Sequence, residues 1–174
     1  LSLENERLSN DTVPRVHEAL FVEDGRSVIM RYIDSNESIK TIYKTIEGGT
    51  GEETGNAFFP NNIPSITVSK DTEQVFYITE LVNGSNGYLA SPSGGDKKLI
   101  FSSPIKEWLV DWKRDATISL NTKASNGTDG FLFLLDSKTK KLRKILAGIP
   151  GLTSSVGPNF EDVLYSESDS SGTS

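Results

Sequence analysis

The sequence predicts an all-β protein built from a repeated unit of about 45 residues. Short apolar runs rich in β-branched and aromatic residues alternate with turn residues, and no stretch keeps a helical period. The four clearest runs begin at Val28, Val75, Ile118 and Val163, at intervals of 47, 43 and 45 residues. A regular spacing of this size indicates that one small unit recurs along the chain.

Other landmarks recur in phase with these four strands. A proline opens each unit, at Pro14, Pro64, Pro104 and Pro150. An extended segment follows, at 16–22, 66–69, 108–112 and 152–156. A polar turn then precedes the landmark strand, at 23–26, 70–73, 113–115 and 157–160. Each unit is therefore predicted to begin with a two-stranded hairpin.

The remainder of each unit predicts two more strands. Loops are expected at 34–37, 82–85, 124–129 and 168–172. Third strands are predicted at 39–46, 87–91 and 131–136, and fourth strands at 57–59, 99–102 and 142–146. Four short strands within about 45 residues are typical of a β-propeller blade, which buries its faces against neighbouring blades.

The predicted fold is therefore a partial β-propeller of about three and a half four-stranded antiparallel blades, forming a single domain over 1–174. Residues 1–10 are expected to end a preceding blade. The blades are assigned to 13–60, 63–103, 104–148 and, cut short, 150–174. Closed rings usually have four to eight blades. We expect an arc of a larger ring, with an open or self-associating fragment as the alternative.

The extended segment 108–112 shows the alternation that a blade requires. Trp108, Val110 and Trp112 fall on one face of the predicted strand, and Leu109 and Asp111 fall on the other. Both faces of the strand can be largely apolar, because each blade is expected to lie between two other blades.

The blade pattern resembles the TolB-type, or PD40, subgroup of WD40-like propellers. Residues 68–77 follow its turn-and-strand pattern most closely, Asp24-Gly25 keeps its turn, and Arg7-Leu8-Ser9 stands where the family has R-L-T. Trp108 and Trp112 occupy positions that are often aromatic in the family. No blade keeps the full S-P-D-G turn. The resemblance implies the fold, an uncharacterised bacterial envelope propeller, and a periplasmic or other extracytoplasmic location. It also implies membrane anchoring through a segment outside this chain.

Composition excludes several classes of function. The chain has 18 basic and 24 acidic residues, which argues against a nucleic-acid partner. It has no cysteine and one histidine, which excludes thiolate chemistry, iron–sulfur clusters and three-histidine metal sites. No apolar run approaches the length needed to span a bilayer. We therefore expect no cofactor and no metal.

No catalytic constellation is visible, and we assign no catalytic residue. His17 lies beside Glu18 on a predicted first strand, where a surface or packed histidine is expected rather than a catalytic base. The sequence contains neither a G-x-S-x-G elbow nor a phosphate-binding P-loop. The glycine-rich segment 48–55 carries two acidic residues and is interpreted as a flexible insertion, or alternatively as a loop that contacts a partner.

Two weaker motifs are interpreted as ordinary polar turns. Glu167, Asp169, Ser171 and Gly172 resemble the start of a calcium loop, but no closing glutamate follows. N-x-[ST] triplets occur at Asn10, Asn36, Asn83 and Asn126, and such triplets arise by chance in a chain rich in serine, threonine and asparagine.

A basic run near the end of the third blade has two interpretations. It consists of Lys138, Lys140, Lys141, Arg143 and Lys144. The run falls on a predicted outermost strand, where lysine discourages edge-to-edge aggregation, and this protective interpretation is preferred. The alternative is a surface for an anionic lipid or an acidic protein.

The functional expectation is a non-enzymatic binding or scaffold module with a protein partner at the cell envelope. A fixed role in an envelope assembly is one form of it. The alternative is a regulatory or gating propeller of a peptidase or glycosidase whose catalytic residues lie outside this segment. A propeller with channel carboxylates would have Glu18 and Glu107 or Asp111 as its candidates.

Overall fold

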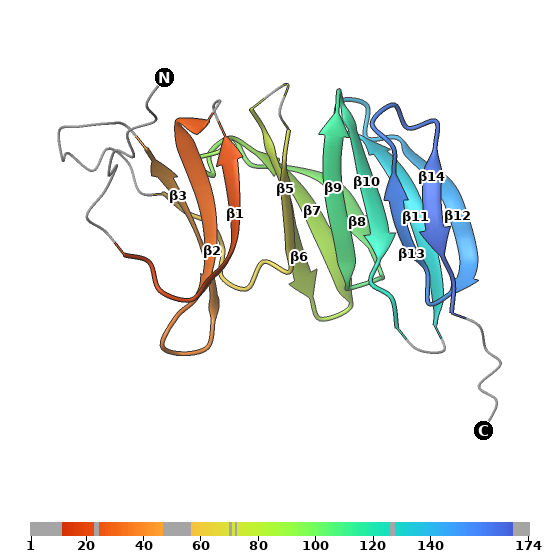
Figure 1. The fold of residues 1–174 in the computed structure, drawn as a ribbon, viewed down its shortest axis with the longest axis horizontal. Helices are drawn as coiled ribbons and strands as arrows, with labels where there is room; N and C mark the ends of the chain where they lie inside the picture. Colours follow the sequence, from red (N-terminus) through yellow and green to blue (C-terminus); the bar gives the residue numbers. More distant parts are fainter. Residues whose placement is uncertain are drawn as a thin grey trace, which may run out of the picture.

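The computed structural model describes residues 12–22, 25–46, 57–69, 71, 73–125 and 128–168. Three four-stranded antiparallel sheets and a two-stranded pair follow one another along the chain (Figure 1). The predicted all-β, partial propeller fold is confirmed. Residues 1–10, expected to end a preceding blade, and the insertion 48–55 lie outside the described residues.

Within each sheet the spatial order of the strands is their order in the chain. The first sheet contains β1 (Val16–Val22), β2 (Ser27–Ile33), β3 (Ile39–Thr45) and β4 (Ala57–Phe58). The second contains β5 (Ser65–Val68), β6 (Val75–Leu81), β7 (Gly84–Ala90) and β8 (Lys98–Ser103). The third contains β9 (Trp108–Arg114), β10 (Thr117–Thr122), β11 (Asp129–Asp136) and β12 (Leu142–Pro150). The pair is β13 (Thr153–Val156) and β14 (Val163–Ser166).

Two predicted turns are shorter than expected. The loop predicted at 82–85 is a tight turn at Val82 and Asn83, because β6 runs to Leu81 and β7 starts at Gly84. Leu81 pairs with Gly84, whose φ of 142° lets the chain reverse at once. In the third sheet, Arg114 ends β9 instead of belonging to the turn.

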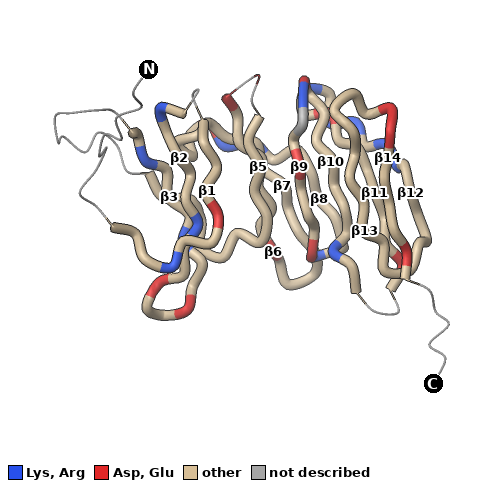
Figure 2. Tube along the Cα trace, viewed as in Figure 1, with Lys and Arg blue, Asp and Glu red and all other residues tan. Residues whose placement is uncertain are grey.

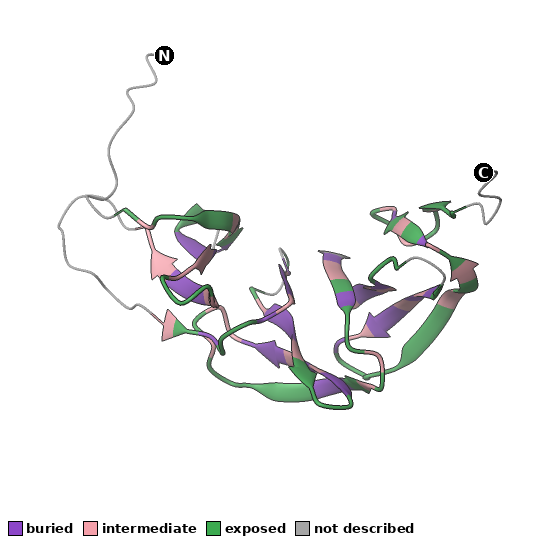
Figure 3. Ribbon diagram, turned by 90° about the horizontal axis from the view of Figure 1, so that it is seen from below, coloured by how far each residue is buried: buried purple, intermediate pink, exposed green. Residues whose placement is uncertain are grey.

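The sheets stand face to face along an arc that is open on one side (Figure 3). A separate apolar cluster fills each junction between consecutive sheets. The predicted alternation in β9 is confirmed, since Trp108 and Trp112 are buried against the second sheet whereas Leu109 is exposed. Each sheet thus owes its stability to burial against its neighbours.

Hydrogen bonds also join the first strands of the second and third sheets. The amide of Val110 donates to Ser65 Oγ at 3.1 Å, and the amide of Trp112 donates to Thr67 Oγ1 at 3.0 Å. Each pair is 45 residues apart, which is one repeat. β9 is the edge of its sheet, so these hydroxyls satisfy N–H groups that no strand pairs.

Replacing Thr67 by valine should leave the buried Trp112 amide without an acceptor. Valine has nearly the same side-chain shape as threonine but no hydroxyl. The free energy of unfolding should therefore fall by the cost of one unsatisfied buried N–H, about 1–3 kcal/mol. Urea denaturation measures it. Thr153→Val, at an exposed position on β13, is the control and should stay within about 0.5 kcal/mol. Equal losses in the two variants would show that the junction hydrogen bond contributes nothing.

Candidate functional site

Hairpins and linkers gather at one end of the sheets, at the lower edge in Figure 1. This end comprises residues 34–38, 60–64, 82–83, 104–107 and 123–125, and we call it the loop face. Antiparallel alternation places the turns between second and third strands there, together with the linkers that enter each first strand. Turns and linkers of this kind present backbone and side-chain groups that can contact a ligand.

Backbone hydrogen bonds hold the loop face together. Ile33 N donates to Arg15 O at 3.3 Å in the first sheet, and Lys123 N donates to Glu107 O at 3.2 Å in the third. Each of these bonds ties the start of a first strand to the end of a second strand. The loop face is therefore fixed to the sheets.

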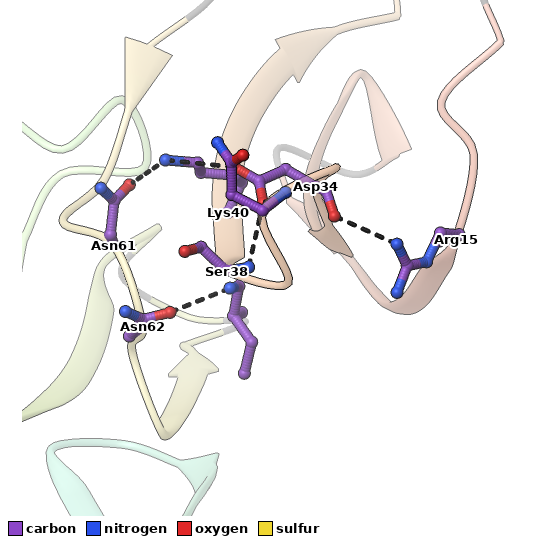
Figure 4. A network of polar contacts seen from close by, with 8 residues as sticks. Arg15, Asp34, Ser38, Lys40, Asn61 and Asn62 are labelled. Carbon is purple, nitrogen blue, oxygen red and sulfur yellow. Dashed lines mark hydrogen bonds and ion pairs between the residues drawn. The ribbon is translucent and has the colours of Figure 1, made fainter.

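Asp34 organises the hairpin of the first sheet (Figure 4). Its Oδ1 accepts the amides of Asn36 at 2.8 Å and Ser38 at 2.9 Å, and its Oδ2 lies 3.6 Å from Lys40 Nζ. The pKa of Asp34 lies below its ordinary value of 3.8, and the hydrogen bond from the Ser38 amide is the largest cause. Desolvation opposes this lowering, and the Asn36 amide and the charge of Lys40 add to it.

The same hairpin is tied to the linker that leaves the first sheet (Figure 4). Asn62 Oδ1 accepts the amide of Ile39 at 2.9 Å, and Lys40 Nζ donates to Asn61 Oδ1 at 3.0 Å. On the other side, Arg15 donates to the carbonyl oxygen of Asp34 at 3.1 Å. These contacts hold three chain segments in one polar network.

Asp34→Asn should remove one acid-sensitive contribution to stability while keeping an amide oxygen to accept the same N–H groups. Because the folded pKa of Asp34 is lowered, its stabilisation is present above the unfolded pKa and is lost as pH falls through the folded value. We therefore expect the difference in Tm between wild type and Asp34→Asn to shrink between pH about 7 and pH about 2.5. A difference that stays constant would show that the Asp34 carboxylate charge is not involved.

Arg31 is a buried contact residue that sequence reasoning missed. Its side chain is 8% exposed; one guanidinium nitrogen lies 2.5 Å from Glu18 Oε2 and another donates to the Ile63 carbonyl. A charged residue inside the apolar run 28–32 was the available signal. The contact joins β1, β2 and the linker beside the loop face.

The three candidate channel carboxylates have different surroundings. Glu18 pairs with Arg31, and Glu107 pairs with Lys123 at 3.0 Å between exposed side chains. Asp111 is half-buried on β9. His17 lies exposed on β1, in agreement with its interpretation as a surface residue. Within the described ranges, no three metal-ligating side chains are grouped to hold an ion.

An apolar tip projects from the loop face. Val82, at the turn between β6 and β7, is 86% exposed, and the adjacent Leu81 is also exposed. The turn is only two residues long, so both side chains are presented by a rigid hairpin. This exposed aliphatic pair lies at the same end of the sheets as the polar network around Asp34.

The N-x-[ST] triplets and the calcium-like positions lie partly inside and partly outside the described residues. Asn36 and Asn83 are exposed in loop-face turns. Asn10, Asn126 and the calcium-like positions from Asp169 to Gly172 lie outside the described residues. In the described part of the chain, no helix is long and apolar enough to cross a membrane.

One open pocket of about 330 Å³ lies away from the loop face, where the turns entering β6 and β8 meet. Its lining residues are Glu73, Gln74, Leu89, Ala90, Ser91, Asp96 and Lys98. Charges of both signs mix there, and the Ser91 hydroxyl shares a hydrogen bond with Ser93 at 3.2 Å.

The arc of meander sheets defines the class: the chain has the architecture of β-propeller domains. Comparison with solved structures agrees. TolB from Acinetobacter baumannii matches with a TM-score of 0.64 and 8% identity over 90% of this chain and 39% of that one. A nidogen/laminin complex matches with a TM-score of 0.60 and 9% identity over 92% and 65%. The propeller domain of the trilobed protease from Pyrococcus furiosus matches with a TM-score of 0.57 and 9% identity over 80% and 45%.

These similarities concern the fold, because the identities are below 10%. This chain spans less than two thirds of the length of each matched structure. No protein-family model matches the chain, and no curated protein matches it. The resemblance to TolB-type propellers is thus supported at the level of structure.

Proposed function

We propose that the chain is a non-catalytic binding module of a bacterial propeller protein at the cell envelope, and that it holds a protein partner on the loop face. The observation that carries this proposal is that the exposed Leu81–Val82 tip and the hydrogen-bonded network of Asp34 lie at the same end of neighbouring sheets. A protein interface of this kind needs an apolar centre that loses its water and a polar surround that fixes orientation.

The rigidity of the loop face supports the same function. Binding costs less conformational entropy when the contact surface is already ordered. The backbone bonds at Ile33 and Lys123 and the side-chain bonds around Asp34 provide that order before a partner arrives. A nidogen/laminin complex is among the similar structures, so the architecture occurs in at least one protein complex.

Site-specific photo-crosslinking tests the proposal. A photoreactive amino acid at position 82 of the full-length parent protein should give a discrete protein adduct in intact cells. The control is the same amino acid at Phe58, which is 70% exposed on β4, the edge strand of the first sheet. Adducts of equal yield at both positions, or none at position 82, would exclude the loop face as a partner site.

The second candidate function is a regulatory or gating propeller of a hydrolase. It is favoured by the match to the trilobed protease and by a match to an acylaminoacyl peptidase, with a TM-score of 0.60 and 7% identity over 80% of this chain and 26% of that one. The full-length parent should then react with a fluorophosphonate probe and hydrolyse peptides. A parent that does neither, while it forms the position-82 adduct, supports the binding module.

A further inference from the structure

Two basic segments that are far apart in sequence meet on the outer edge of the arc, at the end opposite the loop face. Lys140 Nζ donates to the carbonyl of Leu99 at 3.1 Å, so the turn between β11 and β12 contacts β8 of the preceding sheet. We call this cluster the basic rim. It contains Lys97, Lys98, Lys138, Lys140, Lys141, Arg143 and Lys144.

The basic rim is a concentration of positive charge in an acidic chain. Its seven cations stand against two carboxylates in the same segments, Asp96 and Asp136, whereas the whole chain has a net charge of −6. Blue segments recur along the upper ends of the sheets in Figure 2. All seven cationic residues are exposed, and none forms an ion pair within the described ranges.

The neighbouring groups leave this charge available. Asp136 is occupied by its own turn, where its Oδ1 accepts the amides of Lys138 at 2.9 Å and Thr139 at 2.7 Å. Lys97 lies with its Nζ 3.9 Å from the centre of the Tyr88 ring. These contacts order the two segments, and the Asp136 carboxylate, which attracts Lys138, offsets only one of the seven positive charges.

Protection of a strand edge does not explain the cluster. The predicted outermost strand at 142–146 is confirmed as part of β12, but Lys138, Lys140 and Lys141 of the basic run precede it. A tight turn closes there because Asp136 caps it and Lys140 adopts a φ of 60°. Only Arg143 and Lys144 stand on the edge strand of this sheet. Lys98 likewise stands on β8, the edge strand of the second sheet, so edge protection accounts for three of the seven cations. The other four, in the turns, need a different reason.

We propose that the basic rim binds an anionic membrane surface. The cations lie in the turns that enter β8 and β12 and at the beginning of these two edge strands, and Lys98 also lines the open pocket. The exposed side chains of Leu99 and Leu142 lie among them. A broad charged surface with a few apolar contacts matches a lipid headgroup layer.

This orientation leaves the loop face pointing away from the lipid. The turns of the basic rim join third to fourth strands, and the loop-face hairpins join second to third strands, so they lie at opposite ends of the sheets. A chain bound to a membrane through the basic rim could therefore still contact a protein. The inference does not depend on the proposed protein partner.

Vesicle co-sedimentation of the full chain tests the proposal. The protein should sediment with vesicles of phosphatidylglycerol and phosphatidylcholine, and not with phosphatidylcholine alone, and binding should weaken as salt is raised. Lys141→Gln with Lys144→Gln should reduce partitioning roughly 30-fold. The matched control, Lys106→Gln with Lys123→Gln, removes the same charge from the loop face and should leave partitioning within about twofold.

Three results would overturn the proposal. Equal losses in the two double variants would show that overall charge, and not the basic rim, sets the interaction. Equal binding to neutral vesicles would show that charge is not used. Binding to soluble polyglutamate without binding to anionic vesicles would assign the basic rim to an acidic protein instead.

Discussion

Phe76→Ala is expected to destabilise the protein by about 3–5 kcal/mol, a large part of the stability of a domain. Phe76 is fully buried on β6 and belongs to the apolar cluster between the second and third sheets. Truncation would remove apolar contacts and open a cavity that the flanking sheets cannot close without moving. Urea denaturation followed by tryptophan fluorescence measures the loss and reports on Trp108 and Trp112 in the same cluster.

Gly87, whose backbone lies against the ring of Phe76, provides a second test of the same cluster. A Cβ placed on Gly87 would lie 2.5 Å from Cζ of Phe76, so Gly87→Ala should also destabilise the protein. Phe76→Leu shortens the side chain that creates the clash. In a double-mutant cycle, Phe76→Leu should therefore recover part of the loss caused by Gly87→Ala.

The exposed aromatic Phe58 gives the control. It is 70% exposed on β4, and Phe58→Ala should change the free energy of unfolding by no more than about 0.5 kcal/mol. A loss at Phe58 as large as that at Phe76 would contradict the assignment of the stabilising core to the sheet junctions. If the losses from the Gly87 and Phe76 substitutions were strictly additive, the predicted contact between these two residues would be contradicted.

The sheets could be predicted because their signals are local. Strand residues such as those at 28–32 and 75–79 combine β-branched and aromatic side chains, and each run ends at a turn residue. The repeat then reinforced each weak strand signal with its equivalents one period away. The tight turn at Val82 was missed because Gly84 acts through its φ, which the residue type permits but does not impose.

The candidate site depended on contacts between residues 32 and 41 positions apart in the chain. Nothing near Arg31 in sequence shows that its guanidinium reaches the Ile63 carbonyl, and nothing near Lys140 shows that its ammonium reaches Leu99. Such contacts follow from how consecutive sheets stack. The sequence run at 138–144 identified charge, and the fold determined which face carries it.

Gly84→Ala is expected to cost at least about 3 kcal/mol, because two penalties combine at one position. The φ of 142° is one that a residue with a Cβ rarely adopts. A Cβ there would also lie 2.1 Å from the carbonyl oxygen of Ser103 on β8, the partner strand of β7. Since that oxygen belongs to the backbone, no rotamer change can move it, and β7 and β8 would have to separate.

Gly25→Ala isolates the first penalty. Gly25 also has a positive φ, of 87°, but a Cβ there would meet nothing within 4 Å. We expect about 1–2 kcal/mol from backbone strain alone at Gly25, and a clearly larger loss at Gly84. Urea denaturation gives both values, and amide hydrogen exchange should show lost protection in β7 and β8 of the Gly84 variant. Equal losses at the two glycines would show that β8 yields easily, and the closeness of Ser103 to the turn would then have no energetic consequence.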